Sequence, residues 1–183
     1  TEMGLNGSLS TLPGFVTHPI CDAAKHLSGI WGRNFPEQLS QILYLPQNPN
    51  SPGAARFVAA EYQRLRGEFE KKVGHAVEDA ALSRSIRIYN RNRQLLRELM
   101  AIRRDEPWKL GCTEGYLLLR ARTRMPCEEH NALLEAALPL IRARDRVAQD
   151  KPRVVFVGGF CEQPPLEMLE ALDDTCYVVD DDI

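Results

Sequence analysis

A short strand that passes directly into a helix is the feature that most limits how this chain can fold. The pair Phe15–Val16 is typical of the end of a buried strand, and Pro19 stops strand pairing because it offers no backbone N–H. Asp22 is a favourable N-cap for a helix over about 22–32, where apolar residues recur at helical spacing. Ile42–Leu45 has the composition of a second strand, so the order predicts part of a parallel βαβ sheet.

The C-terminal part of the chain shows the same order of elements. Residues 153–158 form a nearly all-apolar run, which is typical of a parallel strand buried on both faces. A helix over about 166–172 and a strand over 176–179 follow. A sheet that ended with this second strand would have a bare apolar edge, which proteins normally avoid. We therefore expect the chain to be a fragment of a longer polypeptide, cut at both ends.

Between these two parts, the apolar residues recur at helical spacing. We expect four helices: one capped by Ser51 and ended by Gly74, one from Asp79 to about Arg104, one over about 113–123, and one that begins after Pro126.

The fold class expected from this order is α/β, with two incomplete Rossmann-like parallel-sheet parts joined by a helical segment. We assign residues 1–48 to the C-terminal remainder of a first α/β domain. Residues 49–150 form the helical segment, and residues 151–183 form the start of a second α/β domain.

Composition excludes several classes of function. The formal net charge of −2 and the pI near 6.1 argue against a general nucleic-acid binder. No apolar run approaches the length that spans a membrane, and the N-terminus lacks the pattern of a signal peptide. We expect a soluble, cytoplasmic protein with neither a nucleic acid nor a membrane as partner.

Cys21 is the most informative of the five cysteines. The five are scattered and include no CxxC pair, so neither a disulfide framework nor a self-contained metal site is indicated. Cys21 lies where a strand meets a helix, at the sheet edge where open α/β folds bind ligands, and a helix N-terminus favours a thiolate. It is a candidate metal ligand or nucleophile, and the alternative is a buried free thiol. Cys112, Cys127 and Cys176 have no motif support and are interpreted as structural thiols.

Eight sequence blocks are informative when they are taken together and in order. They are His18–Asp22, Leu27–Trp31, Leu45–Asn48, Ile88–Arg93, Arg103–Lys109, Glu128–Asn131, Gly159–Leu166 and Val178–Asp182. Together these blocks resemble the benzoyl-CoA reductase and 2-hydroxyacyl-CoA (2-hydroxyglutaryl-CoA) dehydratase family, and the resemblance spans nearly the whole chain. Within that family, the likeness is closest to the B and C type subunits of ATP-dependent benzoyl-CoA reductase.

The resemblance implies a subunit of an oxygen-sensitive enzyme that delivers low-potential electrons to an aromatic acyl-CoA. It also implies other reductase subunits as partners, including an ATP-hydrolysing iron–sulfur activator. Cys21 matches one ligand of a [4Fe-4S] cluster, whose other cysteines would lie outside this chain. This fragment alone is therefore not expected to hold an intact cluster or to be active.

Four further residues become candidates for the site on the same basis. His18 precedes Cys21 by three residues and would donate a proton or a hydrogen bond near the cluster, unless it is only structural. Cys161, Glu162 and Gln163 follow the strand at 153–158 and would line the substrate cleft. Glu162 would act as an acid if burial raises its pKa. The alternative is that this loop only starts the next helix, with Cys161 as packing.

Two sets of charged residues, one of arginines and one of aspartates, can each be interpreted in two ways. The arginines at positions 84, 87, 91 and 97 would bind the nucleotide end of CoA, or they form a solvated helix face with subunit salt bridges. Asp180–Asp182 resemble a carboxylate metal cluster, but their place after an apolar strand favours a role in capping the next turn.

For the whole protein, the alternatives to a reductase subunit are a 2-hydroxyacyl-CoA dehydratase subunit and a non-catalytic interaction module of the same fold.

Overall fold

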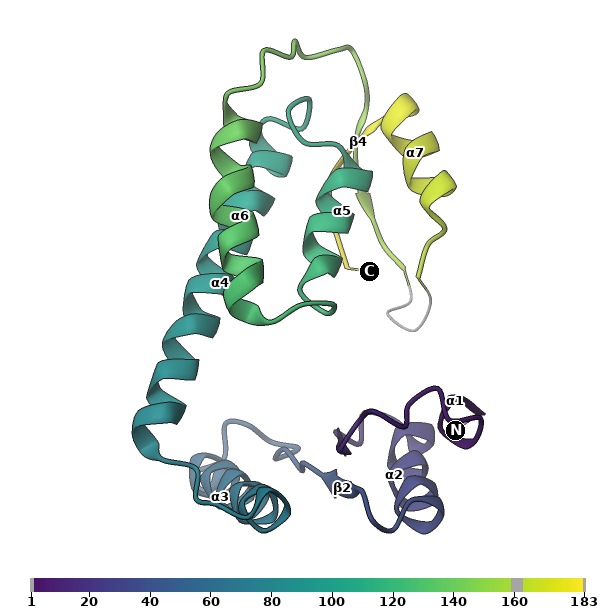
Figure 1. Cartoon of the computed structure of the whole chain (residues 1–183). Helices are drawn as coiled ribbons and strands as arrows, with labels where there is room; N and C mark the ends of the chain where they lie inside the picture. The colour runs from purple at the N-terminus through teal and green to yellow at the C-terminus, as the bar shows by residue number, and fades with distance from the viewer. Residues whose placement is uncertain (1, 159–162, 183) are drawn as a thin grey trace. The chain divides into compact units, whose positions relative to one another are not determined.

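The computed structural model describes residues 2–158 and 163–182, which form mixed helices and short parallel strands (Figure 1). The chain divides into two compact units, Thr1–Glu78 and Asp79–Ile183, which are described separately and are called unit 1 and unit 2. The expected α/β class is confirmed, whereas the Rossmann-like detail and the domain boundaries stay predictions. Within the described residues, no helix is both long enough and apolar enough to cross a membrane.

Unit 1 is a parallel βαβ element followed by a long helix. Strand β1 pairs in parallel with β2, with Gly14 opposite Leu39 and Thr17 opposite Ile42. Gly14 allows this close pairing, because a Cβ there would lie 2.4 Å from the Leu39 Cβ. The elements of unit 1 are α1 (Glu2–Leu5), β1 (Gly14–Thr17), α2 (Asp22–Asn34), β2 (Leu39–Ile42) and α3 (Ala54–Val73).

Trp31 of α2 forms the centre of the small core of unit 1. Its side chain is 4% exposed and lies between Phe15 of β1 and Phe35, with ring centroids 5.3 and 4.6 Å away. The indole N–H donates to the side-chain oxygen of Gln38 at 2.9 Å, so the one polar atom of this buried ring is satisfied. The aromatic cluster holds α2 against the sheet, and with it the loop that joins β1 to α2.

The second strand of unit 1 lies earlier in the sequence than predicted. The sequence favoured Ile42–Leu45, but β2 is Leu39–Ile42. After Leu43 donates its N–H to the Thr17 carbonyl, the N–H of Tyr44 donates instead to the carboxylate of Glu61 on α3. The chain therefore leaves the sheet at this point, and the side chains of Tyr44 and Leu45 are largely exposed.

Helix α3 begins later than predicted and ends as predicted. The predicted N-cap, Ser51, is wrong, because the Ser51 carbonyl accepts from the Ala54 N–H in a turn that precedes the helix. Gly53 is the N-cap and makes no side-chain capping bond. The helix ends at Gly74, whose φ of 78° is the left-handed conformation that glycine adopts without strain.

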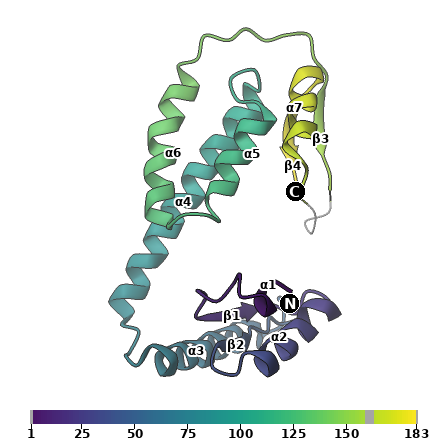
Figure 2. The same ribbon diagram turned by 45° about the vertical axis from the view of Figure 1, so that its right-hand side comes forward.

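The described part of unit 2 combines four helices with a second parallel strand pair (Figure 2). Helices α4 and α6 lie side by side, and α5 and α7 cover the pair β3–β4, which carries a bulge between Val154 and Val155. The elements are α4 (Asp79–Asp105), α5 (Cys112–Ala121), α6 (Cys127–Arg142), β3 (Arg153–Phe156), α7 (Leu166–Thr175) and β4 (Tyr177–Asp181).

Strand β3 is buried on one face only, so the prediction of burial on both faces is wrong for this chain. Val154 and Phe156 pack against the buried cluster formed with Leu169 and Val178. Val155, which points to the other face, is 60% exposed. The alternation arises because α5 and α7 cover one side of the strand, and no described element covers the Val155 side chain.

A polar network lies inside the helical part of unit 2. The His130 side chain is fully buried and contacts the side-chain amide of Asn92 at 2.7 Å and the Leu118 carbonyl at 2.9 Å. The carbonyl can only accept, so Nε2 of His130 carries the proton and Nδ1 accepts from Asn92. The amide of Asn92 also donates to Asn131 at 2.9 Å. The network links α4, α5 and α6. Its hydrogen bonds form only in one register of the three helices, whereas apolar contacts alone would not select a single register.

Candidate functional site

Cys21 lies at the N-terminus of α2, where the loop after β1 ends. It is the N-cap residue, with extended backbone (φ −153°, ψ 169°), and its Sγ accepts the backbone N–H of Ala24 at 3.5 Å. The expected cap, Asp22, is instead the first residue of the helix, so that prediction is wrong. Cys21 is exposed, which also overturns the alternative of a buried free thiol. A sulfur in this position receives a helix N–H and is open to an external group.

A single thiolate suits one corner of an iron–sulfur cluster and cannot hold one alone. Soft sulfur is the ligand that such clusters take from proteins, and several cysteines are needed. Within residues 2–158 and 163–182, no group of three or more His, Cys, Asp or Glu residues could hold a metal ion. A metal site that used Cys21 would therefore need further ligands from beyond the described residues.

His18 lies in the same loop as Cys21, at the carboxyl ends of β1 and β2. Its Nδ1 lies 3.0 Å from the carbonyl oxygen of Leu43, which follows β2. Because that oxygen can only accept, Nδ1 carries a proton and Nε2 is the basic atom of the neutral ring. The side chain is exposed, so Nε2 can reach a ligand or water. The hydrogen bond fixes both the tautomer and the orientation of the ring.

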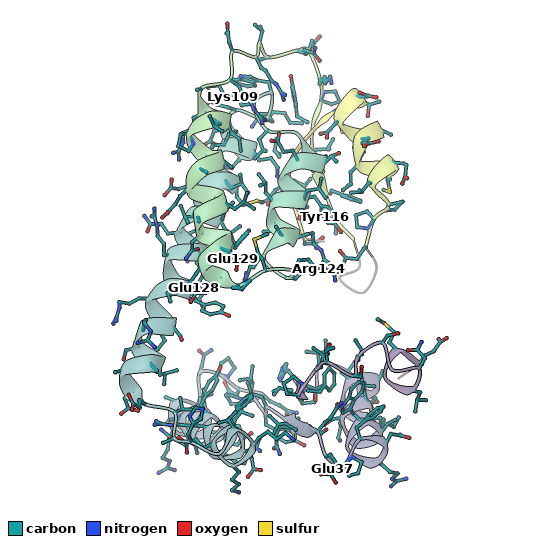
Figure 3. All side chains as sticks on the ribbon, viewed as in Figure 1. Glu37, Lys109, Tyr116, Arg124, Glu128 and Glu129 are labelled. Carbon is teal, nitrogen blue, oxygen red and sulfur yellow. The ribbon has the colours of Figure 1, made fainter. Side chains whose placement is uncertain are left out.

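Gln163 lies at the carboxyl edge of the second sheet, and Tyr116 holds it there. The Tyr116 hydroxyl donates to the side-chain oxygen of Gln163 at 2.5 Å, and this leaves the amide nitrogen of Gln163 open. Figure 3 labels Tyr116 on α5. Sequence reasoning did not select Tyr116, because a single tyrosine among leucines is typical of a helix core. The predicted site residues Cys161 and Glu162 lie outside the described residues.

The predicted site residues fall in two separate units. His18 and Cys21 share one loop of unit 1, and Gln163 belongs to unit 2. The remaining described cysteines are buried, as expected of structural thiols. Burial raises the pKa of the Cys112 thiol to about 11, and burial likewise raises the pKa of Cys127. A buried thiol with a raised pKa is a poor nucleophile, so Cys21 is the cysteine best placed for chemistry.

The described contacts of the three aspartates at 180–182 lie within the fold, and whether they cap a following turn stays a prediction. Asp181 pairs with Arg103 at 2.5 Å, and both side chains are buried, 6% and 1% exposed. The carboxylate of Asp182 accepts from the Gly158 N–H at 2.9 Å, and that of Asp180 accepts from the Asp181 N–H at 3.0 Å. Each carboxylate is thus bound within the chain. In the predicted arginine stripe of α4, Arg91 pairs with Glu135 at 2.8 Å.

Comparison with known proteins finds a family model and relatives whose names all describe acyl-CoA reductase or dehydratase components. A family model described as 2-hydroxyglutaryl-CoA dehydratase, D-component, matches residues 1–183. The chain is 36% identical to the C-type subunit of benzoyl-CoA reductase from Thauera aromatica over 182 residues, 99% of this chain and 47% of that protein. It is 30% identical to lactoyl-CoA dehydratase subunit beta of Anaerotignum propionicum over 183 residues, 100% and 48% of the two chains.

A third relative is (R)-2-hydroxyglutaryl-CoA dehydratase, subunit beta, of Acidaminococcus fermentans. The identity is 26% over 178 residues, which cover 94% of this chain and 45% of that protein. The chain therefore spans about half the length of the curated relatives that it matches.

Proposed function

Because the chain belongs to the 2-hydroxyglutaryl-CoA dehydratase D-component family, we propose that it is part of a subunit of a benzoyl-CoA reductase. The whole enzyme would reduce an aromatic acyl-CoA with electrons from an ATP-hydrolysing iron–sulfur activator, and other reductase subunits would complete it. The higher identity to the reductase subunit, 36% against 30% for the lactoyl-CoA dehydratase subunit, supports this choice.

The observation that carries the proposal is the exposed sulfur of Cys21 at the start of α2. We assign Cys21 as one protein ligand of a [4Fe-4S] cluster, with the remaining ligands outside this chain. When bound, such a cluster supplies single electrons at low potential. The Ala24 N–H that reaches Sγ would stabilise the negative charge of the sulfur, and the N-terminus of α2 would add to this effect.

His18 would hold and release a proton beside this ligand. In the charged ring, both nitrogens carry protons, and the Leu43 carbonyl retains the one on Nδ1. The proton on Nε2 is then the one that His18 can give to a reduced substrate. The same hydrogen bond persists in the neutral ring, so proton release requires no reorientation. Gln163, held by Tyr116, would offer its free amide N–H to the substrate.

The proposal is tested on the complete polypeptide, purified without oxygen together with its partner subunits. Iron and acid-labile sulfide are measured in the wild type, in Cys21→Ala, and in Cys127→Ala as a matched control at a buried thiol. We expect Cys21→Ala to lose most of the cluster and Cys127→Ala to keep it. Full iron content in folded Cys21→Ala would contradict the ligand assignment.

A second candidate function is dehydration of a 2-hydroxyacyl-CoA, which the names of the family model and of two relatives favour. The same purified complex separates the two functions. Electron uptake that depends on benzoyl-CoA supports the reductase, and loss of water from a 2-hydroxyacyl-CoA supports the dehydratase. A folded complex that contains no metal would instead favour a non-catalytic module of the same fold.

A further inference from the structure

Three arginines at the end of α5 and in the turn before α6 carry charge that no described carboxylate neutralises. Arg120, Arg122 and Arg124, together called the arginine tract, form no ion pair within the residues that the structure describes. Other arginines of unit 2, such as Arg142 and Arg144, do pair with glutamates. Arg122 and Arg124 are exposed, so their guanidinium groups are available to an anion from outside.

The arginine tract adjoins the carboxyl edge of the β3–β4 sheet. The guanidinium of Arg120 lies 6.0 Å from the centroid of the Tyr116 ring, and the Tyr116 hydroxyl binds Gln163 in the loop after β3. Figure 3 labels Tyr116 about midway along α5 and Arg124 just beyond the C-terminal end of the helix. Open α/β sheets bind ligands at their carboxyl edge. The unpaired positive charge therefore lies where such a ligand would bind.

The carboxylates nearest in sequence do not cancel this charge. Glu128 and Glu129 lie in the first turn of α6, where the helix N-terminus favours negative charge, and neither pairs with a described arginine. Figure 3 labels both on α6, apart from Arg124 and Tyr116. Burial and Glu128 raise the pKa of the Cys127 thiol, and Arg122 and Arg93 lower it, so two arginines and one glutamate lie near this sulfur.

We propose that the arginine tract binds the phosphates of coenzyme A. This inference rests on the proposed function, in which the protein takes an acyl-CoA. The relatives are named for different acyl groups, benzoyl, lactoyl and 2-hydroxyglutaryl, and share only the CoA part. That part carries a diphosphate and a 3′-phosphate, which guanidinium groups bind through paired, charge-assisted hydrogen bonds. The proposal thus assigns the nucleotide end of the substrate to the end of α5 and the turn before α6, and not to the arginine stripe of α4.

The test compares two double variants of the complete protein in its anaerobic complex. Arg122→Gln with Arg124→Gln removes two charges of the tract, and Arg84→Gln with Arg87→Gln removes two exposed charges from α4. Dissociation constants are measured by calorimetry for CoA, for dephospho-CoA, which lacks the 3′-phosphate, and for pantetheine, which lacks the nucleotide and every phosphate. Circular dichroism checks that each variant is folded.

We expect the tract variant to bind CoA about tenfold or more weakly than the wild type, and the α4 variant to change by less than about twofold. Pantetheine binding should change little in either variant, and lysines at 122 and 124 should restore only part of the affinity for CoA, because an ammonium group lacks the paired donors of a guanidinium. Equal CoA affinity of the tract variant and the wild type would overturn the inference and leave the proposed function intact. Absence of CoA binding by the wild type would overturn the proposed function itself.

Discussion

Removal of the Asp181 carboxylate should be among the most damaging single changes in unit 2. The change Asp181→Asn keeps the shape of the side chain and removes its charge. Arg103 is 1% exposed, so water cannot replace the lost partner. Its Nε and Nη2 atoms already lack a hydrogen-bond acceptor among the described residues, so the substitution leaves a buried cation without a counter-charge.

The expected loss of folding free energy follows from the burial of the Arg103–Asp181 pair and not from the distance between the two charged groups. Breaking a buried ion pair by removing one partner costs about 3–5 kcal/mol. Domains are stable by only about 5–15 kcal/mol, so the loss is a large fraction of the total. The pair Arg142–Glu98 has a similar distance, 2.8 Å, but is 48% and 34% exposed. The change Glu98→Gln should therefore cost less than about 1 kcal/mol.

Hydrogen exchange followed by mass spectrometry of the complete protein measures these effects locally. In Asp181→Asn, amides of β4 and of the C-terminal half of α4 should exchange about 100-fold to 3000-fold faster, which corresponds to 3–5 kcal/mol. Peptides of β1 and β2 serve as the internal control. The double variant Arg103→Met with Asp181→Leu should recover most of the protection, because it buries no charge. The reasoning is refuted if Asp181→Asn costs no more than Glu98→Gln.

Four other predictions concern single side chains. Gly14→Ala should destabilise β1 by about 1–3 kcal/mol, because its Cβ would clash with Leu39, whereas Gly29→Ala meets no neighbour within 4 Å and should be neutral or stabilising in thermal melts. In native protein at pH 8, alkylation should modify Cys21 and spare Cys112, whose pKa is near 11. Because the pKa of folded Cys112 is raised, its contribution to stability is present below about pH 9 and falls between pH 9 and 11, as denaturation titrations would show. The change His18→Asn places a side-chain N–H where Nδ1 lies, so the hydrogen bond to Leu43 and the iron content should be kept. Turnover should be slower, because the proton on Nε2 is lost. Unchanged turnover across the pH range would exclude a proton-transfer role for His18.

Local sequence signals predicted those parts of the fold that depend on local chemistry. Gly74 ends α3 because its backbone adopts a positive φ, and Asp79 starts α4 at the predicted residue. The two parallel strand pairs follow from the order of apolar runs and helices. The place of Cys21 at a helix start was also predicted, because a strand, a proline and a helix signal surround it, whereas its exposure was left open.

The features that the sequence did not reveal depend on contacts between distant residues. The end of β2 is set by Glu61, which lies on the next helix and accepts the Tyr44 N–H. The hydrogen bond that holds Gln163 comes from Tyr116, far earlier in the chain, and no local pattern distinguishes that tyrosine from a core residue. No local sequence pattern indicates the burial of Arg103 either, because arginine near a helix end is ordinarily a surface residue.

The pairing of Arg103 with Asp181 also bears on how the polypeptide is made. On the ribosome, α4 and α6 emerge well before β4, so their contacts through Asn92 and His130 can form early. Arg103 remains without its counter-charge until β4, the last described strand, has been synthesised. A nascent chain stalled before Asp181 would thus hold a helical pair with an unneutralised cation at one end, and such an intermediate is a natural substrate for chaperones.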